Sequence, residues 1–163
     1  MINSNNLTGA IAALLEEYKK AIDELIAIIS PLNPAQLTAI VNPDALDEDV
    51  RSIQNILSHV VASTYSYTVY IENWIGLHTV RPNRYVFDNV KDYIEKLNSG
   101  FSYCENCFLQ NRDIPLEEFD NNKKINTRWG QQYDVEQLME HAIVHILRHR
   151  RQIQNIIKRN QPA

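Results

Sequence analysis

The segment from Asp134 to Asn160 contains neither glycine nor proline, the two residues that most often interrupt a helix. Its apolar residues recur with the period of a helix and not with the alternation of a strand. They are Val135, Leu138, Met139, Ala142, Ile146, Ile153, Ile156 and Ile157. Asp134, followed three residues later by Gln137, has the pattern of a capping box, and Lys158 and Arg159 carry the charge that a helix C-terminus favours. We therefore predict one long helix over residues 134–160.

Three further segments show the same amphipathic period: residues 7–30, about 49–75 and about 87–109. Pro31 and Gly76 end the first two. Gly100 lies inside the third, where it costs about 1 kcal/mol relative to alanine. Together with residues 134–160, these segments predict an all-α four-helix bundle with a long crossover connection.

The connections differ in character. Residues 31–49 contain three prolines and a run of acids, which predicts a loop with a short helical turn around residues 34–40. Residues 110–133 are polar and are expected to bridge back to the opening helix. Within them, residues 124–130 are expected to form a strand-like or irregular approach that brings Trp129 and Tyr133 toward the last helix.

The length of 163 residues favours a single domain, residues 1–163, which can bury a core without disulfides or a structural metal. A metal bound to such a chain is therefore expected to take part in a reaction more than to stabilise the fold. The net charge of −4 and the isoelectric point near 5.7 argue against a nucleic-acid partner, because phosphate binding needs a basic surface. The cations between Arg148 and Arg159 are expected to form a solvated face.

No stretch approaches the ~20 uninterrupted apolar residues of a membrane span, so no membrane association is expected. The N-terminus also lacks a charged leader followed by an apolar core, the pattern of a signal peptide. Both observations favour a cytoplasmic location.

Three of the five histidines, His141, His145 and His149, follow one another at a spacing of four. Residues four apart lie one turn above each other on a helix, with a rotation of about 40° per step. Two adjacent members can therefore share one metal ion, whereas His141 and His149 are about 80° apart. The spacing does not choose between the pairs 141/145 and 145/149. The ordinary alternative is a set of surface or hydrogen-bonded core histidines.

Two histidines lie outside this segment. His59 is at the edge of the apolar stripe of the second helix, three residues after Ile56, from where it can point toward neighbouring helices. His78 lies in a connection and is a less rigid ligand candidate.

Cys104 and Cys107 form a C-x-x-C pair, a spacing found in redox centres and in half of a zinc site. The chain has no second C-x-x-C pair and no adjacent βαβ pattern. We therefore expect two partly buried thiols on the third helix.

The histidine segments resemble those of the DinB/YfiT-like four-helix-bundle metalloproteins, and the resemblance covers nearly the whole chain. In that family a histidine of the second helix joins two histidines, spaced four apart, in the last helix, usually followed by Arg-Gly-Gln and an aliphatic residue. Residues 145–153 match that ending, and residues 52–59 match the second-helix approach. Trp129 and Tyr133, upstream of the last helix, also fit the family.

The resemblance implies that the metal ligands are His59, His145 and His149, with His141 as a neighbour or hydrogen-bond donor beside them. It thereby selects the pair 145/149. Two positions depart from the family. Arg151 stands where most members have glycine, which bears on packing beside the site, and Ile146 stands where many members have glutamate after the first histidine. The protease mechanism that uses this glutamate as general base is therefore disfavoured.

The same resemblance implies a function. Three neutral imidazoles suit zinc or nickel first, and also iron or copper, and leave a position for water or substrate. The expected activity is a metal-dependent transferase that uses a low-molecular-weight thiol, with metal-dependent hydrolysis of small molecules as the alternative. Tyr67, Trp129, Arg148 and His141 are pocket candidates, for which packing or solvation is the ordinary explanation.

The resemblance to the family also predicts the partners of the chain. A small-molecule substrate and a homodimer are expected by analogy with the family. The rival explanations are a non-catalytic, stress-associated protein that binds a metal and a helical interaction protein without one.

Overall fold

The computed structural model describes residue 7 and residues 9–159. Two predictions fall on the remaining residues: the absence of a signal peptide at the N-terminus and the extension of the last helix to Asn160. Both lie outside the described residues.

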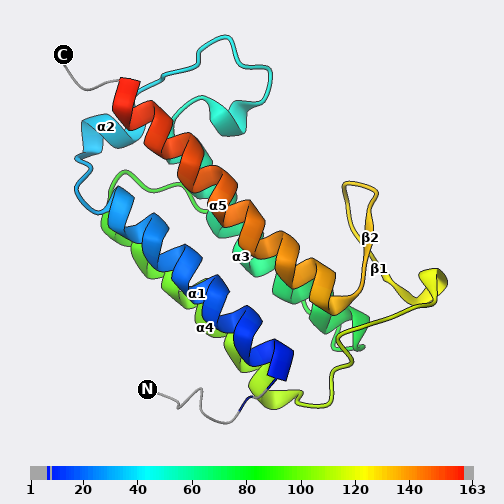
Figure 1. Cartoon of the computed structure of the whole chain (residues 1–163). Coiled ribbons are helices and arrows are strands. Elements are labelled where there is room, and N and C mark those ends of the chain that lie inside the picture. Colours follow the sequence, from blue (N-terminus) through cyan, green and yellow to red (C-terminus); the bar gives the residue numbers. More distant parts are fainter. Residues whose placement is uncertain (1–6, 8, 160–163) are drawn as a thin grey trace.

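Four long helices pack side by side along the molecule (Figure 1). They are α1 (Gly9–Ile29), α3 (Ile53–Trp74), α4 (Val90–Gln110) and α5 (Val135–Arg159). Helix α1 contacts α4 and α5, and α3 contacts the same two helices, so α1 and α3 are diagonal neighbours. The predicted all-α fold class is confirmed.

The connections contain the short elements. They are α2 (Pro34–Thr38), the 3-10 turns η2 (Glu48–Val50) and η3 (Asn121–Lys123), and the strands β1 (Ile125–Asn126) and β2 (Gln132–Tyr133). The two strands pair antiparallel, with Ile125 opposite Tyr133. The expected short helix after Pro31 and the strand-like approach before the last helix are both present.

Side-chain caps set the helix boundaries. At the start of α5, the Gln137 N–H donates to the Asp134 carboxylate at 2.8 Å and the Asp134 N–H donates to the Gln137 side chain at 3.1 Å, which confirms the capping box. Helix α4 begins at Val90 and not near Phe87, because Asn89 is its N-cap and accepts from the Asp92 N–H.

Helices α3 and α4 run parallel, and the connection between them crosses the molecule. The Gln54 side chain, near the start of α3, donates to the Phe87 carbonyl at 2.9 Å, just before α4 begins. The Ser58 hydroxyl likewise donates to the Tyr85 carbonyl. Residues 77–89 therefore return along α3, and they form the long crossover. Residues 111–134 instead stay at one end of the helices and carry the β-hairpin beside the first half of α5 (Figure 1).

The core lies between the four helices. Its largest fully buried side chains are Tyr18, Ile22, Leu25, Ile29, Leu37, Ile53, Ile56, Leu57, Ile71, Tyr93, Leu97 and Leu138. None of the described helices is both long and apolar enough to cross a membrane.

Gly100 marks a close approach of α4 to α3. A Cβ added at this residue would lie 3.1 Å from the Thr64 Cβ. Thr64 is β-branched and buried, and its hydroxyl donates to the carbonyls of Val60 and Val61 at 3.0 and 2.8 Å, so it has little room to move. The helix propensity lost at Gly100 therefore permits tight packing of the two helices.

We expect Gly100→Ala to lower the free energy of unfolding by about 1 kcal/mol, because overpacking costs ~1–3 kcal/mol and exceeds the gain in helix propensity of about 1 kcal/mol. Urea unfolding measures this difference. Ser99→Ala, an exposed neighbour on α4, is the matched control and is expected to change stability by less than about 0.5 kcal/mol. A Gly100→Ala variant more stable than the wild type would contradict this explanation.

Candidate metal centre

Three histidines from two helices meet beside the core. His59 of α3 and His145 and His149 of α5 each offer a ligand nitrogen, and these nitrogens all lie within 4.8 Å of one another. The expectation that these three residues converge is confirmed. We call them the histidine triad, and they are close enough to bind one metal ion.

The antiparallel packing of α3 and α5 explains the convergence. His145 and His149 are one turn apart, and their ring centroids are 4.4 Å apart. The His59 ring lies 5.0 Å from each of them. The His141 ring is 6.4 Å from that of His145 and does not belong to the cluster, so the geometry selects the pair 145/149.

A carboxylate orients His59. The Asp49 carboxylate lies 3.0 Å from His59 Nδ1, and its other oxygen accepts from Arg84 Nη1 at 2.6 Å. Arg84 Nε in turn donates to the Ser58 hydroxyl at 2.8 Å. Asp49 belongs to η2, which packs against α3, and its N–H donates to the Asp47 side chain at 2.9 Å. An imidazole whose Nδ1–H donates to a carboxylate presents the lone pair of Nε2, the usual arrangement of a histidine ligand.

His149 has an equivalent partner on its own helix. Its Nδ1 lies 3.0 Å from the Gln152 side-chain oxygen, which leaves Nε2 free for a metal. Gln152 lies in the segment that matches the family ending, but the sequence does not predict its hydrogen bond to His149.

His145 is only partly satisfied by hydrogen bonds within the described part of the chain. Its Nε2 lies 2.9 Å from Nε2 of His59, and its Nδ1 is buried without a partner. Buried polar groups in folded proteins are nearly always paired, so an ordinary core histidine would have a partner at each nitrogen. The close approach of the two Nε2 atoms suits two ligands that face one metal ion.

The protonation state also suits a metal. Burial, followed by the charges of the neighbouring histidines, lowers the pKa of His145 to about 2. Burial lowers the pKa of His149 to about 4, although its hydrogen bond to Gln152 opposes the shift. Burial also lowers the pKa of His59 despite the nearby Asp49. The triad is therefore neutral at pH 7, which is the form of imidazole that binds metals.

The lowered pKa values predict that the metal-free protein loses stability in acid. The ordinary histidine pKa of 6.5 applies to the unfolded chain, which therefore binds more protons than the folded one below that pH. Between pH 6.5 and 4.5, His145 alone is expected to account for roughly 2–3 kcal/mol of lost stability, at about 1.4 kcal/mol per pH unit. Urea unfolding in EDTA measures the loss, and His145→Gln should flatten the profile. An unchanged slope in that variant would contradict the assignment.

The triad is open on the side of α3. His149 is buried, whereas the His59 side chain keeps 32% of its surface exposed and the Asp49 side chain keeps 28%. A metal held by three protein ligands here would retain a position that a small molecule can reach.

Aromatic side chains form a wall beside the triad. The buried Tyr67 ring lies 5.8 Å from the rings of His145 and His141. Trp129, from the hairpin, stacks on His141 at 5.3 Å and 17°, and the Tyr133 hydroxyl lies 3.2 Å from His141 Nδ1. Tyr67, Trp129 and His141 are predicted pocket candidates, and Tyr133 is predicted to approach the last helix. All four contact the triad or one another, and none of them belongs to the triad.

A cavity continues from this wall toward the hairpin. Its volume is about 410 Å³, and it lies between α3 and the hairpin. Its lining consists of Ser63, Ser66, Tyr67, Tyr70, Arg128 and Trp129. Tyr67 lines this cavity, and its ring also lies 5.8 Å from that of His145 in the triad.

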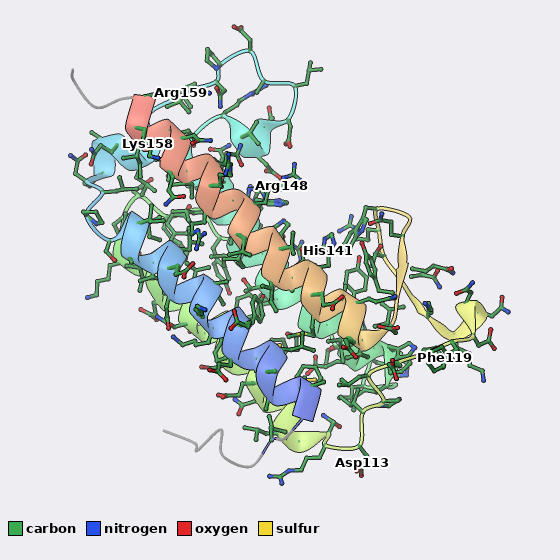
Figure 2. The ribbon with its side chains drawn as sticks, in the orientation of Figure 1. Asp113, Phe119, His141, Arg148, Lys158 and Arg159 are labelled. Carbon is green, nitrogen blue, oxygen red and sulfur yellow. The ribbon has the colours of Figure 1, made fainter. Side chains whose placement is uncertain are left out.

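The remaining candidates lie elsewhere. Arg148 is exposed on α5 (Figure 2), and its charge contributes to the lowered pKa values of the three α5 histidines. His78 is exposed in the crossover with a φ of 53° and is not in the cluster.

The thiols of Cys104 and Cys107 are free and buried in α4, as part of the core. Burial raises the pKa of each to about 12, so neither is a thiolate at neutral pH. Cys104 Sγ lies 3.9 Å from the Met139 sulfur, a packing contact. Both therefore belong to the core, more deeply buried than the sequence predicts.

No family model, curated protein or solved structure matches the chain. Any assignment of function therefore depends on the geometry of the triad and on the resemblance carried by residues 52–59 and 145–153.

Proposed function

We propose that the chain is a DinB/YfiT-like four-helix-bundle metalloprotein, in which His59, His145 and His149 hold a divalent transition metal, zinc or nickel foremost. The observation that carries the proposal is the convergence of three neutral imidazoles from two helices. Asp49 and Gln152 support it, because each pairs with the Nδ1 of one ligand and leaves its Nε2 for the metal.

We further propose that the site works as a transferase dependent on a low-molecular-weight thiol. A bound divalent metal supplies a Lewis acid that favours the deprotonated form of such a thiol. The sulfur then forms a bond to an electrophilic carbon of a second substrate, the leaving group departs with the bonding pair, and the thiol proton passes to solvent.

Among the described residues, the carboxylate that contacts the triad belongs to Asp49 and is already paired, which favours this chemistry over hydrolysis. The residue after His145 is the buried Ile146, where a glutamate would act as general base for water. Asp49 is engaged by His59 and Arg84. A thiol ionises more readily than water and does not need such a base. The role of the chain is to orient the ligands and to provide the cavity beside Tyr67 and Trp129 for the body of the substrate.

Turnover assays on metal-loaded protein test the proposal. Cysteine and glutathione are supplied as thiols with monobromobimane as the electrophile, and His145→Ala is the control for metal-independent reaction. We expect metal-dependent conjugation that is lost in His145→Ala. Turnover of nitrophenyl esters without thiol conjugation would assign a hydrolase, and neither activity in a fully loaded sample would favour a non-catalytic metal-binding protein.

A further inference from the structure

The cavity between α3 and the hairpin lies along the same face of α3 as His59. Four of its lining residues belong to α3 and follow His59 by four, seven, eight and eleven residues, which are the spacings of one helix face. They are Ser63, Ser66, Tyr67 and Tyr70. Because a helix rises about 1.5 Å per residue, Ser63 is about 6 Å along the axis from His59. The near end of the cavity therefore lies one helical turn beyond this residue of the triad.

The hairpin brings Arg128 to the other side of this cavity. The Arg128 N–H donates to the Tyr70 hydroxyl at 3.0 Å. On either side of it, the hydroxyl and the N–H of Thr127 donate to the Gln131 carbonyl, and the Gly130 N–H donates to the Thr127 carbonyl at 3.0 Å. These bonds fix the backbone of the turn and do not involve the guanidinium. Replacing the Arg128 side chain should therefore leave the hairpin in place.

The polar groups of the cavity suit an anion. Arg128 is charged, and the described residues of the lining include no carboxylate. Within the described part of the chain, no carboxylate lies within ion-pairing distance of the Arg128 guanidinium. The Tyr70 hydroxyl accepts from the Arg128 N–H, and its own proton has no acceptor among the described residues. A guanidinium and a hydroxyl with hydrogens left to donate are typical partners of a carboxylate.

The remainder of the cavity is largely aromatic. Trp129 keeps 44% of its surface exposed, although tryptophan is highly buried on average. The rings of Tyr67 and Tyr70 lie 6.3 and 5.9 Å from that of Trp129, at 84° and 89° to it. A flat ring placed against Trp129 would cover this exposed surface and gain aromatic contacts. The cavity therefore suits an aromatic body attached to the carboxylate.

We propose that this cavity binds the electrophilic substrate, that this substrate is an aromatic carboxylate, and that Arg128 binds its carboxylate group. The inference rests on the proposed function, in which a thiol at the metal forms a bond to a carbon of a second substrate. With the carboxylate at Arg128 and the ring against Trp129, the reactive carbon lies toward the end of the cavity that is nearest to His59. Arg128 then selects the substrate and takes no part in bond making.

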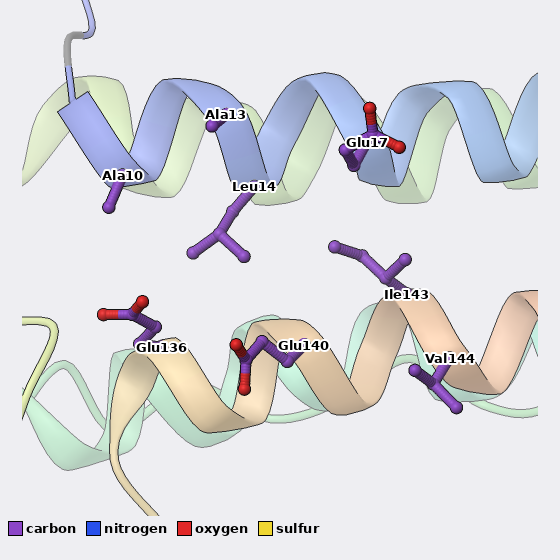
Figure 3. Close-up of a pocket in the computed structure, with 8 residues that line it drawn as sticks. All are labelled: Ala10, Ala13, Leu14, Glu17, Glu136, Glu140, Ile143 and Val144. Carbon is purple, nitrogen blue, oxygen red and sulfur yellow. The ribbon is translucent and has the colours of Figure 1, made fainter.

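The groove between α1 and α5 has the opposite character (Figure 3). It has a volume of about 590 Å³, and its lining includes the carboxylates of Glu17, Glu136 and Glu140. These charges repel a carboxylate ligand. An anionic molecule is therefore expected in the smaller cavity beside Arg128 and not in this larger groove.

Binding to the metal-free protein tests the carboxylate site independently of any activity. Isothermal titration calorimetry in EDTA compares p-toluate with p-toluamide, which has the same shape and no charge. We expect p-toluate to bind about 10-fold more tightly, because charge-assisted hydrogen bonds are stronger than neutral ones. Arg128→Met should remove this preference. Arg159→Met, which removes the same charge from an exposed position at the end of α5, is the matched control and should keep it.

Turnover by the metal-loaded protein tests the role in substrate selection. With glutathione and p-(bromomethyl)benzoate, the sulfur forms a bond to the benzylic carbon, bromide leaves with the bonding pair, and the thiol proton passes to solvent. We expect Arg128→Met to lower kcat/KM for this substrate about 10-fold, mainly through KM. The values for p-(bromomethyl)benzamide and for monobromobimane, neither of which has a carboxylate, should not change.

The two experiments separate this inference from the proposed function. Equal binding of p-toluate and p-toluamide, or a preference that persists in Arg128→Met, would overturn the carboxylate site. An unchanged kcat/KM of Arg128→Met for p-(bromomethyl)benzoate would overturn the role of Arg128 in substrate selection. Binding of p-toluate through Arg128 in a protein that transfers no thiol would support the carboxylate site and contradict the transferase instead.

Discussion

Replacing His145 by alanine is expected to abolish the retention of a divalent metal, and His59→Ala and His149→Ala should do the same. Each change removes one of three nitrogens that lie within 4.8 Å of one another, and the two that remain do not fix a site. Elemental analysis of protein purified without an affinity tag, loaded with zinc or nickel and then dialysed, measures the effect.

His141→Ala is the control for this experiment, because it removes a histidine of the same helix that lies outside the triad. It should keep the metal content of the wild type. Retention of metal in His149→Ala together with its loss in His141→Ala would show that the pair 141/145, which the spacing alone also permits, is the true one.

Replacing Asp49 by alanine is expected to weaken metal binding by about 10- to 100-fold while the fold stays intact. The carboxylate pairs with Nδ1 of His59 and thereby fixes the orientation of the ring and strengthens Nε2 as a ligand. Competition with a chromophoric chelator measures the affinity. Asp49→Asn preserves the shape but not the charge, and it should lie between alanine and the wild type.

Asp44→Asn serves as the matched control, because Asp44 is exposed in the same connection as Asp49. It should bind metal with wild-type affinity. Equal affinities for Asp49→Ala and the wild type would mean that the contact with His59 does not support a metal ligand.

The sequence predicts much of this architecture, because the helices are strongly periodic and capped. The capping box of Asp134 and Gln137 and the end of α3 before Gly76 are local signals, and both are present. The spacing of His145 and His149 likewise depends only on helix geometry. The choice of His59 as third ligand came from the resemblance, since its distance from α5 depends on how the helices pack.

Tertiary contacts explain what local patterns missed. The sequence predicts one long crossover without locating it. Residues 77–89 form it, because the carbonyls of Phe87 and Tyr85 accept hydrogen bonds from side chains near the start of α3. From the sequence, Asp49 is predicted only to lie near the start of the second helix, and nothing in the sequence indicates its contact with His59. Its role appears when η2 folds against α3 and places the carboxylate beside His59.

The central claim is that the histidine triad holds one metal ion, and anomalous diffraction from crystals of the zinc-loaded protein tests it most directly. We expect one anomalous peak at about 2.0–2.1 Å from a ring nitrogen of each of His59, His145 and His149. A zinc-loaded crystal without a peak at this position, or with the ion bound by His141 and His145 instead, would contradict the account.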